Sequence, residues 1–404
     1  MLTSLGLIFL LGFLMAAICQ KIHLPRIIGM LFTGIILGPY VLNLLDASIL
    51  NISSQLRQIA LIIILLKAGL SLDLKDLKKV GRSAVMLSCV PATCELLAFV
   101  IFAPMILNIS RVDAAVMGAV LAAVSPAVVV PRMVHLMENG YGTEKSIPQM
   151  ILAGASCDDI YVIVLFSTFA GMAQGGHVKA LDFVNIPVSI LTGVLFGALV
   201  GWLLGQLFEL LFRKDRYVRN SMKVIIIMGV SFLLMALETM LKGTVAFSGL
   251  LAVVSMACAL KMRTPKEVTG RLSAKFGKLW LAAEVVLFVL VGAAVDIRYT
   301  MEAGLAAVGM ILLALAFRSV GVALCLLGTE LGKKERLFCM IAYLPKATVQ
   351  AAIGSVPLAM GLSCGKIVLS VAVLAILITA PLGALGMDAT YRKLLQKNGE
   401  NNIT

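Results

Sequence analysis

Long apolar stretches recur along this chain about every 30 residues, and they constrain its fold more than any other feature. Each stretch can cover the ~30 Å hydrocarbon core of a bilayer, which takes about 20 helical residues. Lipid offers no hydrogen-bond partners to the backbone, so a spanning segment is either a helix or a strand of a closed barrel. The runs are continuous rather than alternating with polar residues, which excludes the barrel. The sequence therefore predicts an all-α polytopic membrane protein.

Charged residues and Pro/Gly-marked breaks divide the chain into thirteen expected transmembrane helices. These cover residues 2–20, 25–42, 54–71, 82–107, 112–134, 147–171, 185–212, 222–241, 244–260, 279–295, 302–328, 335–360 and 364–388. Only 14% of the residues are charged, against about 25% in an average soluble protein. The composition thus excludes a soluble domain of this length.

The basic residues lie mostly on one side of the expected membrane. Alternate loops and the C-terminal tail carry 25 Lys and Arg residues, and the opposite loops carry six. We expect the protein in the cell inner (plasma) membrane. The positive-inside rule then places its N-terminus outside and its C-terminus in the cytoplasm. The net charge of +13 is then explained by basic loops that face anionic lipid. No nucleic-acid partner is expected.

Two halves of the chain share a short motif at an offset of 223 residues. Gly69-Leu-Ser-Leu-Asp73 ends the third span and Gly292-Ala-Ala-Val-Asp296 ends the tenth. This offset predicts a first six-helix repeat over residues 1–171 and a second over 222–390, joined by a connector over 172–221 and followed by a short tail over 391–404. The connector crosses the membrane once, so the repeats would be inverted, which is the architecture of alternating-access transporters.

Adjacent carboxylates, Asp158 and Asp159, lie near the centre of the sixth span. An ionisable group in mid-membrane costs at least ~2.5–3.5 kcal/mol, so such groups are few and functional. Successive helical residues point about 100° apart, so one carboxylate can face an aqueous cavity while the other is held by a partner. Two like charges this close in a low dielectric disfavour ionisation of both. A pair of this kind can hold either a proton or a cation. Buried packing carboxylates are the alternative interpretation.

Glu95 and Arg318 form the next informative pair, because they are separated by 223 residues, the same offset as Asp73 and Asp296. They occupy equivalent positions in the two repeats, and a buried arginine needs an acidic partner. We expect a buried Glu95–Arg318 salt bridge. This bridge either holds the core together or opens during transport.

Prolines interrupt the fifth and twelfth spans, in Val124-Ser125-Pro126 and in Pro345-Lys346. Proline in a helix interior removes a backbone hydrogen bond, so two broken helices that cross near the midplane are expected. Lys346 would offset helix C-terminal dipoles or pair with an aspartate. Simple kinks are the alternative. Glu284 in the tenth span either faces an access funnel or extends to the membrane interface.

These features resemble the monovalent cation/proton antiporters of the NhaA and NapA fold, and within that group the NHA-type sodium/proton exchangers. The resemblance covers nearly the whole chain. It implies a homodimer, and it implies that Asp159 is the principal ion- and proton-carrying group with Asp158 in support. NhaA and NapA carry a lysine where this chain has Arg318, and arginine does not deprotonate in proteins. Arg318 therefore cannot carry a transported proton, which leaves open whether exchange is electrogenic or electroneutral.

The sequence predicts a secondary active sodium (or lithium)/proton antiporter for pH and sodium homeostasis, without enzymatic activity or a cofactor. Asp158 and Asp159 would bind the transported ion together with Ser125 and freed backbone carbonyls. The alternatives are a potassium/proton antiporter, a sodium-coupled organic-anion symporter of related fold, and an intramembrane aspartyl protease. The protease would need one aspartate on each of two facing helices, commonly in a Gly-x-Gly-Asp motif, which is absent from this sequence.

Overall fold

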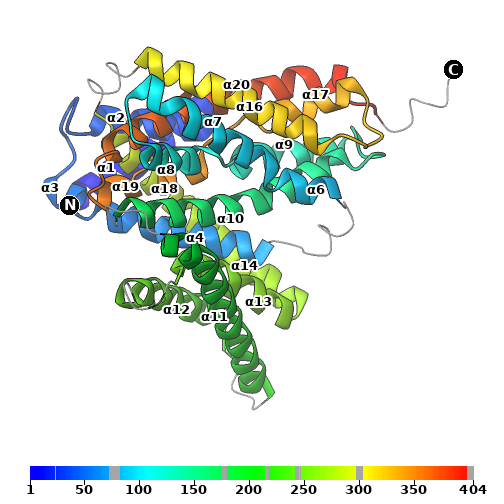
Figure 1. The fold of residues 1–404 in the computed structure, drawn as a ribbon. Helices are drawn as coiled ribbons and strands as arrows, with labels where there is room; N and C mark the ends of the chain where they lie inside the picture. Colours follow the sequence, from blue (N-terminus) through cyan, green and yellow to red (C-terminus); the bar gives the residue numbers. More distant parts are fainter. Residues whose placement is uncertain are drawn as a thin grey trace. The chain divides into compact units, whose positions relative to one another are not determined.

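A computed structural model describes residues 1–22, 24–71, 82–174, 180–213, 218–241, 245, 247–296 and 304–397. Within these residues the regular elements are helices, with one isolated β-bridge between Tyr141 and Lys397 (Figure 1). The predicted all-α membrane fold is confirmed. Asp73, the first-repeat member of one predicted repeat match, lies outside the described residues.

Packing divides the chain into two compact units that interleave along the sequence. The first comprises Met1–Ser54, Asp73–Ala173 and Val285–Thr404, and the second comprises Gln55–Leu72 and Gln174–Glu284. The helices of the first unit are α1 (Leu2–Lys21), α2 (Arg26–Leu37), α3 (Ala47–Asn51), α6 (Arg82–Leu87), α7 (Val90–Leu107), α8 (Arg111–Leu121), α9 (Pro126–Glu138), α10 (Ile147–Gln174), α16 (Gly304–Cys325), α17 (Lys333–Ala342), α18 (Thr348–Ile353), α19 (Val356–Ala359) and α20 (Gly365–Leu394). The second unit holds most of α4 (Ser53–Ser71), α11 (Ala180–Arg213), α12 (Asn220–Leu241), α13 (Gly249–Arg263) and the first part of α14 (Lys266–Ala293).

Ten helical segments of the described residues are long and apolar enough to cross a membrane. The other three expected spans coincide with shorter helices, namely α2 with 12 residues, α13 with 15 residues, and the α17–α19 region, where α17 has 10. At a rise of about 1.5 Å per residue, a helix of 10 to 15 residues covers about half to three quarters of the hydrocarbon core. The total of thirteen spans stays a prediction.

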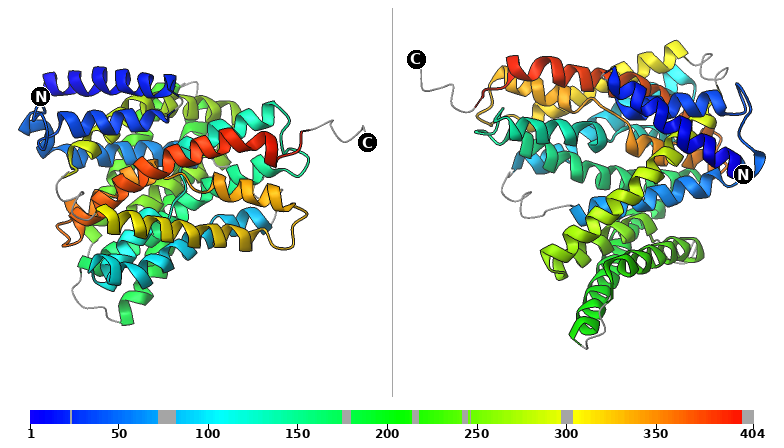
Figure 2. Two further views of the ribbon diagram at one scale, coloured as in Figure 1. Left: turned by 90° about the horizontal axis from the view of Figure 1, so that it is seen from above. Right: turned by 180° about the vertical axis from the view of Figure 1, so that it is seen from behind.

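The core of the first unit is built around α7, which packs against α8 and α16 (Figure 1). The long helix α20 packs against α16, α17 and α8. α1 and α2 lie side by side in both views of Figure 2. There Gly29 meets the backbone of Met15 so closely that a side chain would overlap it. Only glycine permits this approach of two helices.

The second unit uses the same device between α11 and α13. Gly193, Gly197 and Gly201 lie one turn apart on α11 and face the backbone of α13 at Ser248, Ala252 and Met256. A stripe of small residues at a spacing of four lets two helices pack closely where lipid provides no hydrophobic driving force. Large apolar side chains of α11 and α12, among them Leu195 and Ile225, are exposed, as expected of surfaces that face lipid.

Acidic residues fix the first turns of α8 and α17. The Asp113 backbone N–H donates to the Ser110 hydroxyl at 3.0 Å, and that hydroxyl donates to the Asp113 carboxylate at 2.7 Å. The Gly332 N–H donates to the Glu335 carboxylate at 2.7 Å. A carboxylate in the first turn satisfies free N–H groups and complements the helix dipole. Both helices are thereby anchored at the ends remote from their breaks.

Candidate functional site

Two helices of the first unit are broken, and the breaks lie against each other. α8 ends at Leu121 and α9 begins at Pro126, while α17 ends at Ala342 and α18 begins at Thr348. Between the breaks the Ser125 N–H donates to the Pro345 carbonyl at 2.8 Å. The two broken helices predicted from the prolines are confirmed. Pro131, the second proline of this region, lies inside helical α9.

The chain leaves the helix after Leu121, so backbone carbonyls there have no helical partners. Cationic and amide side chains donate hydrogen bonds to them instead. Lys346 Nζ donates to the Leu121 carbonyl at 2.5 Å, and Gln350 Nε2 donates to the Ala123 carbonyl at 2.8 Å. Arg318 donates to the Ala122 carbonyl and, through Nε, to the Tyr343 carbonyl at 2.7 Å. Free carbonyls at a helix C-terminus carry partial negative charge, which stabilises these cations.

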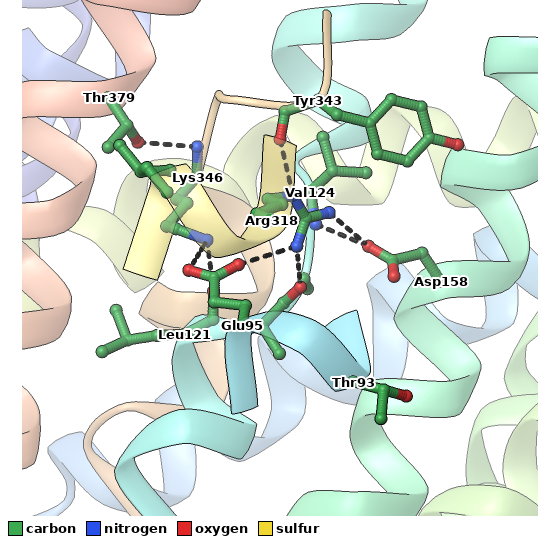
Figure 3. Close-up of polar contacts among 12 residues, drawn as sticks. Thr93, Glu95, Leu121, Val124, Asp158, Arg318, Tyr343, Lys346 and Thr379 are labelled. Atoms are coloured by element: carbon green, nitrogen blue, oxygen red, sulfur yellow. Dashed lines mark hydrogen bonds and ion pairs between the residues drawn. The ribbon is translucent and has the colours of Figure 1, made fainter. Parts of the chain in front are cut away.

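Glu95 on α7 lies between the two cations (Figure 3). One carboxylate oxygen pairs with Arg318 Nη1 at 2.8 Å and the other with Lys346 Nζ at 2.6 Å. All three side chains are at most 1% exposed. The predicted Glu95–Arg318 salt bridge is confirmed. Of the partners considered for Lys346, the structure shows the C-terminal end of α8, and its acidic partner is Glu95 rather than an aspartate.

Asp158 on α10 reaches the same cluster. Its Oδ2 accepts from Arg318 Nη2 at 3.2 Å and from the Val124 N–H in the break at 2.7 Å. Its Oδ1, in contrast, has no hydrogen-bond partner among the described residues. Asp159 Oδ1 is likewise buried without a hydrogen-bond partner among the described residues. As whole residues, Asp159 is 9% exposed and Asp158 is fully buried. The neighbours therefore differ as expected of adjacent helical positions, because one is held by partners and the other is more accessible.

Ser125 lies at this site and Glu284 belongs to a different packing unit. The buried Ser125 hydroxyl is 3.5 Å from the Thr348 hydroxyl. Glu284 lies inside α14, is 8% exposed, and belongs to the second unit. Its assignment to an access funnel stays a prediction.

Four polar residues of this site, Tyr343, Thr348, Gln350 and Thr379, are absent from the set predicted from the sequence. Thr379 accepts the Lys346 N–H at 2.9 Å, which satisfies the backbone of the second break. Thr348 follows Ser125 by 223 residues, so the repeat offset itself was a signal for it. Gln350 is a buried amide in an apolar run, which marks a functional position in membrane helices. Tyr343 carries no comparable signal.

The chain matches known proteins over nearly its whole length. Residues 6–390 match the family model described as "Sodium/hydrogen exchanger, transmembrane". The chain is 34% identical over 392 residues to human sodium/hydrogen exchanger 9B2, and the match covers 94% of this chain and 71% of that protein. It is 33% identical over 402 residues to human sodium/hydrogen exchanger 9B1, with 93% and 73% covered.

A solved structure also shares the fold. The sodium proton antiporter MjNhaP1 from Methanocaldococcus jannaschii at pH 8 superposes with a TM-score of 0.80 and 24% identity, covering 97% of this chain and 98% of that one. This likeness concerns the fold, whereas the family model and the human relatives establish kinship. The predicted membership of the monovalent cation/proton antiporter superfamily is thus confirmed, and the chain belongs to the transmembrane sodium/hydrogen exchanger family.

Proposed function

We propose that this chain exchanges sodium (or lithium) for protons, and that both ions bind in turn at Asp158 and Asp159. Family membership supports the reaction. One observation carries the assignment of the site: two carboxylate oxygens, Asp158 Oδ1 and Asp159 Oδ1, are buried without a partner among the described residues, beside crossed broken helices. A buried polar atom without a partner costs free energy, which a bound proton or cation removes.

The charges of the cluster support the same assignment. Glu95, Asp158 and Asp159 are three carboxylates, and Arg318 and Lys346 are two cations, all at most 9% exposed. When all five are ionised, one negative charge is left over. Uncompensated buried charge is strongly unfavourable, so the site needs one monovalent positive charge to reach neutrality. A proton or a sodium ion meets this need equally, and the two therefore compete.

The oxygen atoms near the break would complete the coordination of the cation. Hard cations take oxygen ligands from carboxylates, carbonyls and hydroxyls. We assign Asp159 as the principal carrier with Asp158 in support, and the Ser125 hydroxyl and break carbonyls as further ligands. Glu95, Arg318 and Lys346 supply the fixed charge that holds the crossed breaks together. Arginine stays protonated, so Arg318 is part of the scaffold rather than a proton carrier.

Alternating access in this proposal uses the two inverted repeats, residues 1–171 and 222–390, with 172–221 as connector. The contacts Glu95–Arg318 and Ser125–Thr348 support it, because both pairs are separated by 223 residues and meet in the core. The chain would work as a homodimer in a cell inner (plasma) membrane, with its N-terminus outside, its C-terminus cytoplasmic and its basic loops against anionic lipid. Glu284 would attract cations into an access funnel.

The proposed reaction is tested by reconstituting the protein in liposomes that contain a pH-sensitive dye. Sodium or lithium added outside should alkalinise the lumen, because cations that enter are exchanged for protons that leave, and Asp159→Asn should abolish the change. The asparagine keeps the size of the side chain and removes its charge. A variant with wild-type exchange would refute the assignment of Asp159. Exchange of protons with potassium alone would identify the chain as a potassium/proton antiporter instead. Sodium-driven uptake of an organic anion without proton flux would identify it as a symporter.

A further inference from the structure

Tyr343 contacts both Arg318 and the part of α10 that carries Asp158. It directly follows α17, and its carbonyl accepts from Arg318 Nε at 2.7 Å. Its ring lies over the same guanidinium group, with 5.6 Å between Arg318 Cζ and the ring centroid. Its hydroxyl extends to α10, where it occupies the space that a side chain at Gly154 would take. One residue therefore contacts both Arg318 and the α10 turn that precedes Asp158.

Packing does not explain the Tyr343 hydroxyl. Tyr343 is fully buried, and within the described part of the chain its hydroxyl has no hydrogen-bond partner. A buried hydroxyl without a partner is unfavourable, and tyrosine in a core normally finds one. Phenylalanine would fill the same space without this cost. The hydroxyl is therefore best explained by a partner that it meets at another step of the transport cycle.

The matching acceptor is the free oxygen of Asp158. Asp158 follows Gly154 by one helical turn, so both lie on the same face of α10. Figure 3 shows the Tyr343 ring and Asp158 on the same side of the guanidinium group. A helical side chain leans toward the preceding turn, so that of Asp158 leans toward the turn of Gly154, which the hydroxyl contacts. Asp158 Oδ1 has no hydrogen-bond partner among the described residues and can accept from this hydroxyl.

Building on the proposed function, we infer that Tyr343 is a positioning residue for the cation: its hydroxyl donates a hydrogen bond to Asp158 when that carboxylate turns from Arg318 to the bound ion. Arg318 Nη2 lies 3.2 Å from Asp158 Oδ2. A carboxylate that stayed on the guanidinium group would bind the cation next to a positive charge that repels it. A neutral hydroxyl can hold the carboxylate without this repulsion, so cation binding exchanges a charged partner for an uncharged one.

Tyr343→Phe tests this inference in the reconstituted exchange assay. The apparent KM for sodium should rise roughly tenfold, the scale of one hydrogen bond to a charged group, while the maximal rate stays near that of the wild type. Tyr391→Phe, which removes a hydroxyl bonded to exposed Arg392, is the matched control and should leave KM unchanged. A purely structural role would instead lower yield and maximal rate and leave KM unaltered, which would overturn the inference.

A second variant tests the contact between the Tyr343 hydroxyl and Gly154 of α10. Gly154→Ala places a methyl group on the Tyr343 hydroxyl and 3.0 Å from Leu87 Cβ, whereas the ring carbon Cζ would stay 3.5 Å away, an ordinary contact. Gly154→Ala alone should therefore impair sodium exchange more than Tyr343→Phe. The double variant should recover toward the KM of Tyr343→Phe, because the hydroxyl is gone and only the tighter contact with Leu87 is left. A double variant as impaired as Gly154→Ala would contradict the proposed contact.

The outcomes separate this inference from the proposed function. Loss of exchange in Asp159→Asn together with a wild-type KM in Tyr343→Phe would refute the role of Tyr343 alone. Full exchange in Asp159→Asn would refute the site itself. A raised KM in Tyr343→Phe with an unchanged maximal rate supports both.

Discussion

Replacing Arg318 with alanine should destabilise the protein by about 3–5 kcal/mol, the cost of breaking a buried ion pair. The guanidinium group binds Glu95, Asp158 and the carbonyls of Ala122 and Tyr343. Its loss removes one partner each from the buried carboxylates of α7 and α10 and from a carbonyl of each broken helix. The thermal unfolding midpoint of the purified protein in detergent should fall accordingly, or the variant should fail to accumulate.

The matched control is Arg132→Ala, which breaks an ion pair with Asp388 at 2.8 Å. The Asp388 side chain is 51% exposed, and ion pairs in contact with solvent contribute about 0–1 kcal/mol. This variant should melt close to the wild type. If Arg318→Ala and Arg132→Ala melted at the same temperature, the cluster would not be what holds the crossed breaks together.

Asp158→Asn should raise the KM for sodium by at least about tenfold while the protein stays folded. Asparagine keeps an oxygen that can accept from the Val124 N–H and from Arg318, so the scaffold contacts at 2.7 Å and 3.2 Å can persist. The charge of the five-residue cluster, however, changes from minus one to zero. A cation then brings an uncompensated positive charge into the site, which is unfavourable in a low dielectric.

Asp388→Asn serves as the control for this charge change, because it also removes one carboxylate but from an exposed position. It should leave the KM for sodium unaltered in the same liposome assay. An Asp158→Asn protein with the KM of the wild type would show that Asp158 does not contribute charge to cation binding.

The sequence predicts much of this site because intramembrane charge is costly and therefore informative. Glu95 and Arg318 could be paired from charge, burial and the common offset of 223 residues. The breaks could be placed because Pro126 cannot donate a helical hydrogen bond. These inferences rest on local chemistry and on the common offset, both of which are visible in one chain.

Other parts of the site depend on the crossing geometry. Arg318 satisfies Glu95, Asp158 and two carbonyls at once, which no pairwise argument from sequence provides. Lys346 binds Glu95 and not an aspartate, because the break places its ammonium group beside α7 and the end of α8. Tyr343 gives no signal in the sequence, because an aromatic residue in an apolar segment ordinarily indicates packing.

If a proton and a cation compete for Asp158 and Asp159, sodium binding must release protons from the protein, and this release can be measured. Sodium chloride is added to purified protein in weakly buffered detergent solution, and the pH is followed with a dye; choline chloride controls for ionic strength. We expect saturable proton release from the wild-type protein with sodium and none from Asp159→Asn. Equal release from Asp159→Asn and the wild type would show that the two ions do not compete at these carboxylates.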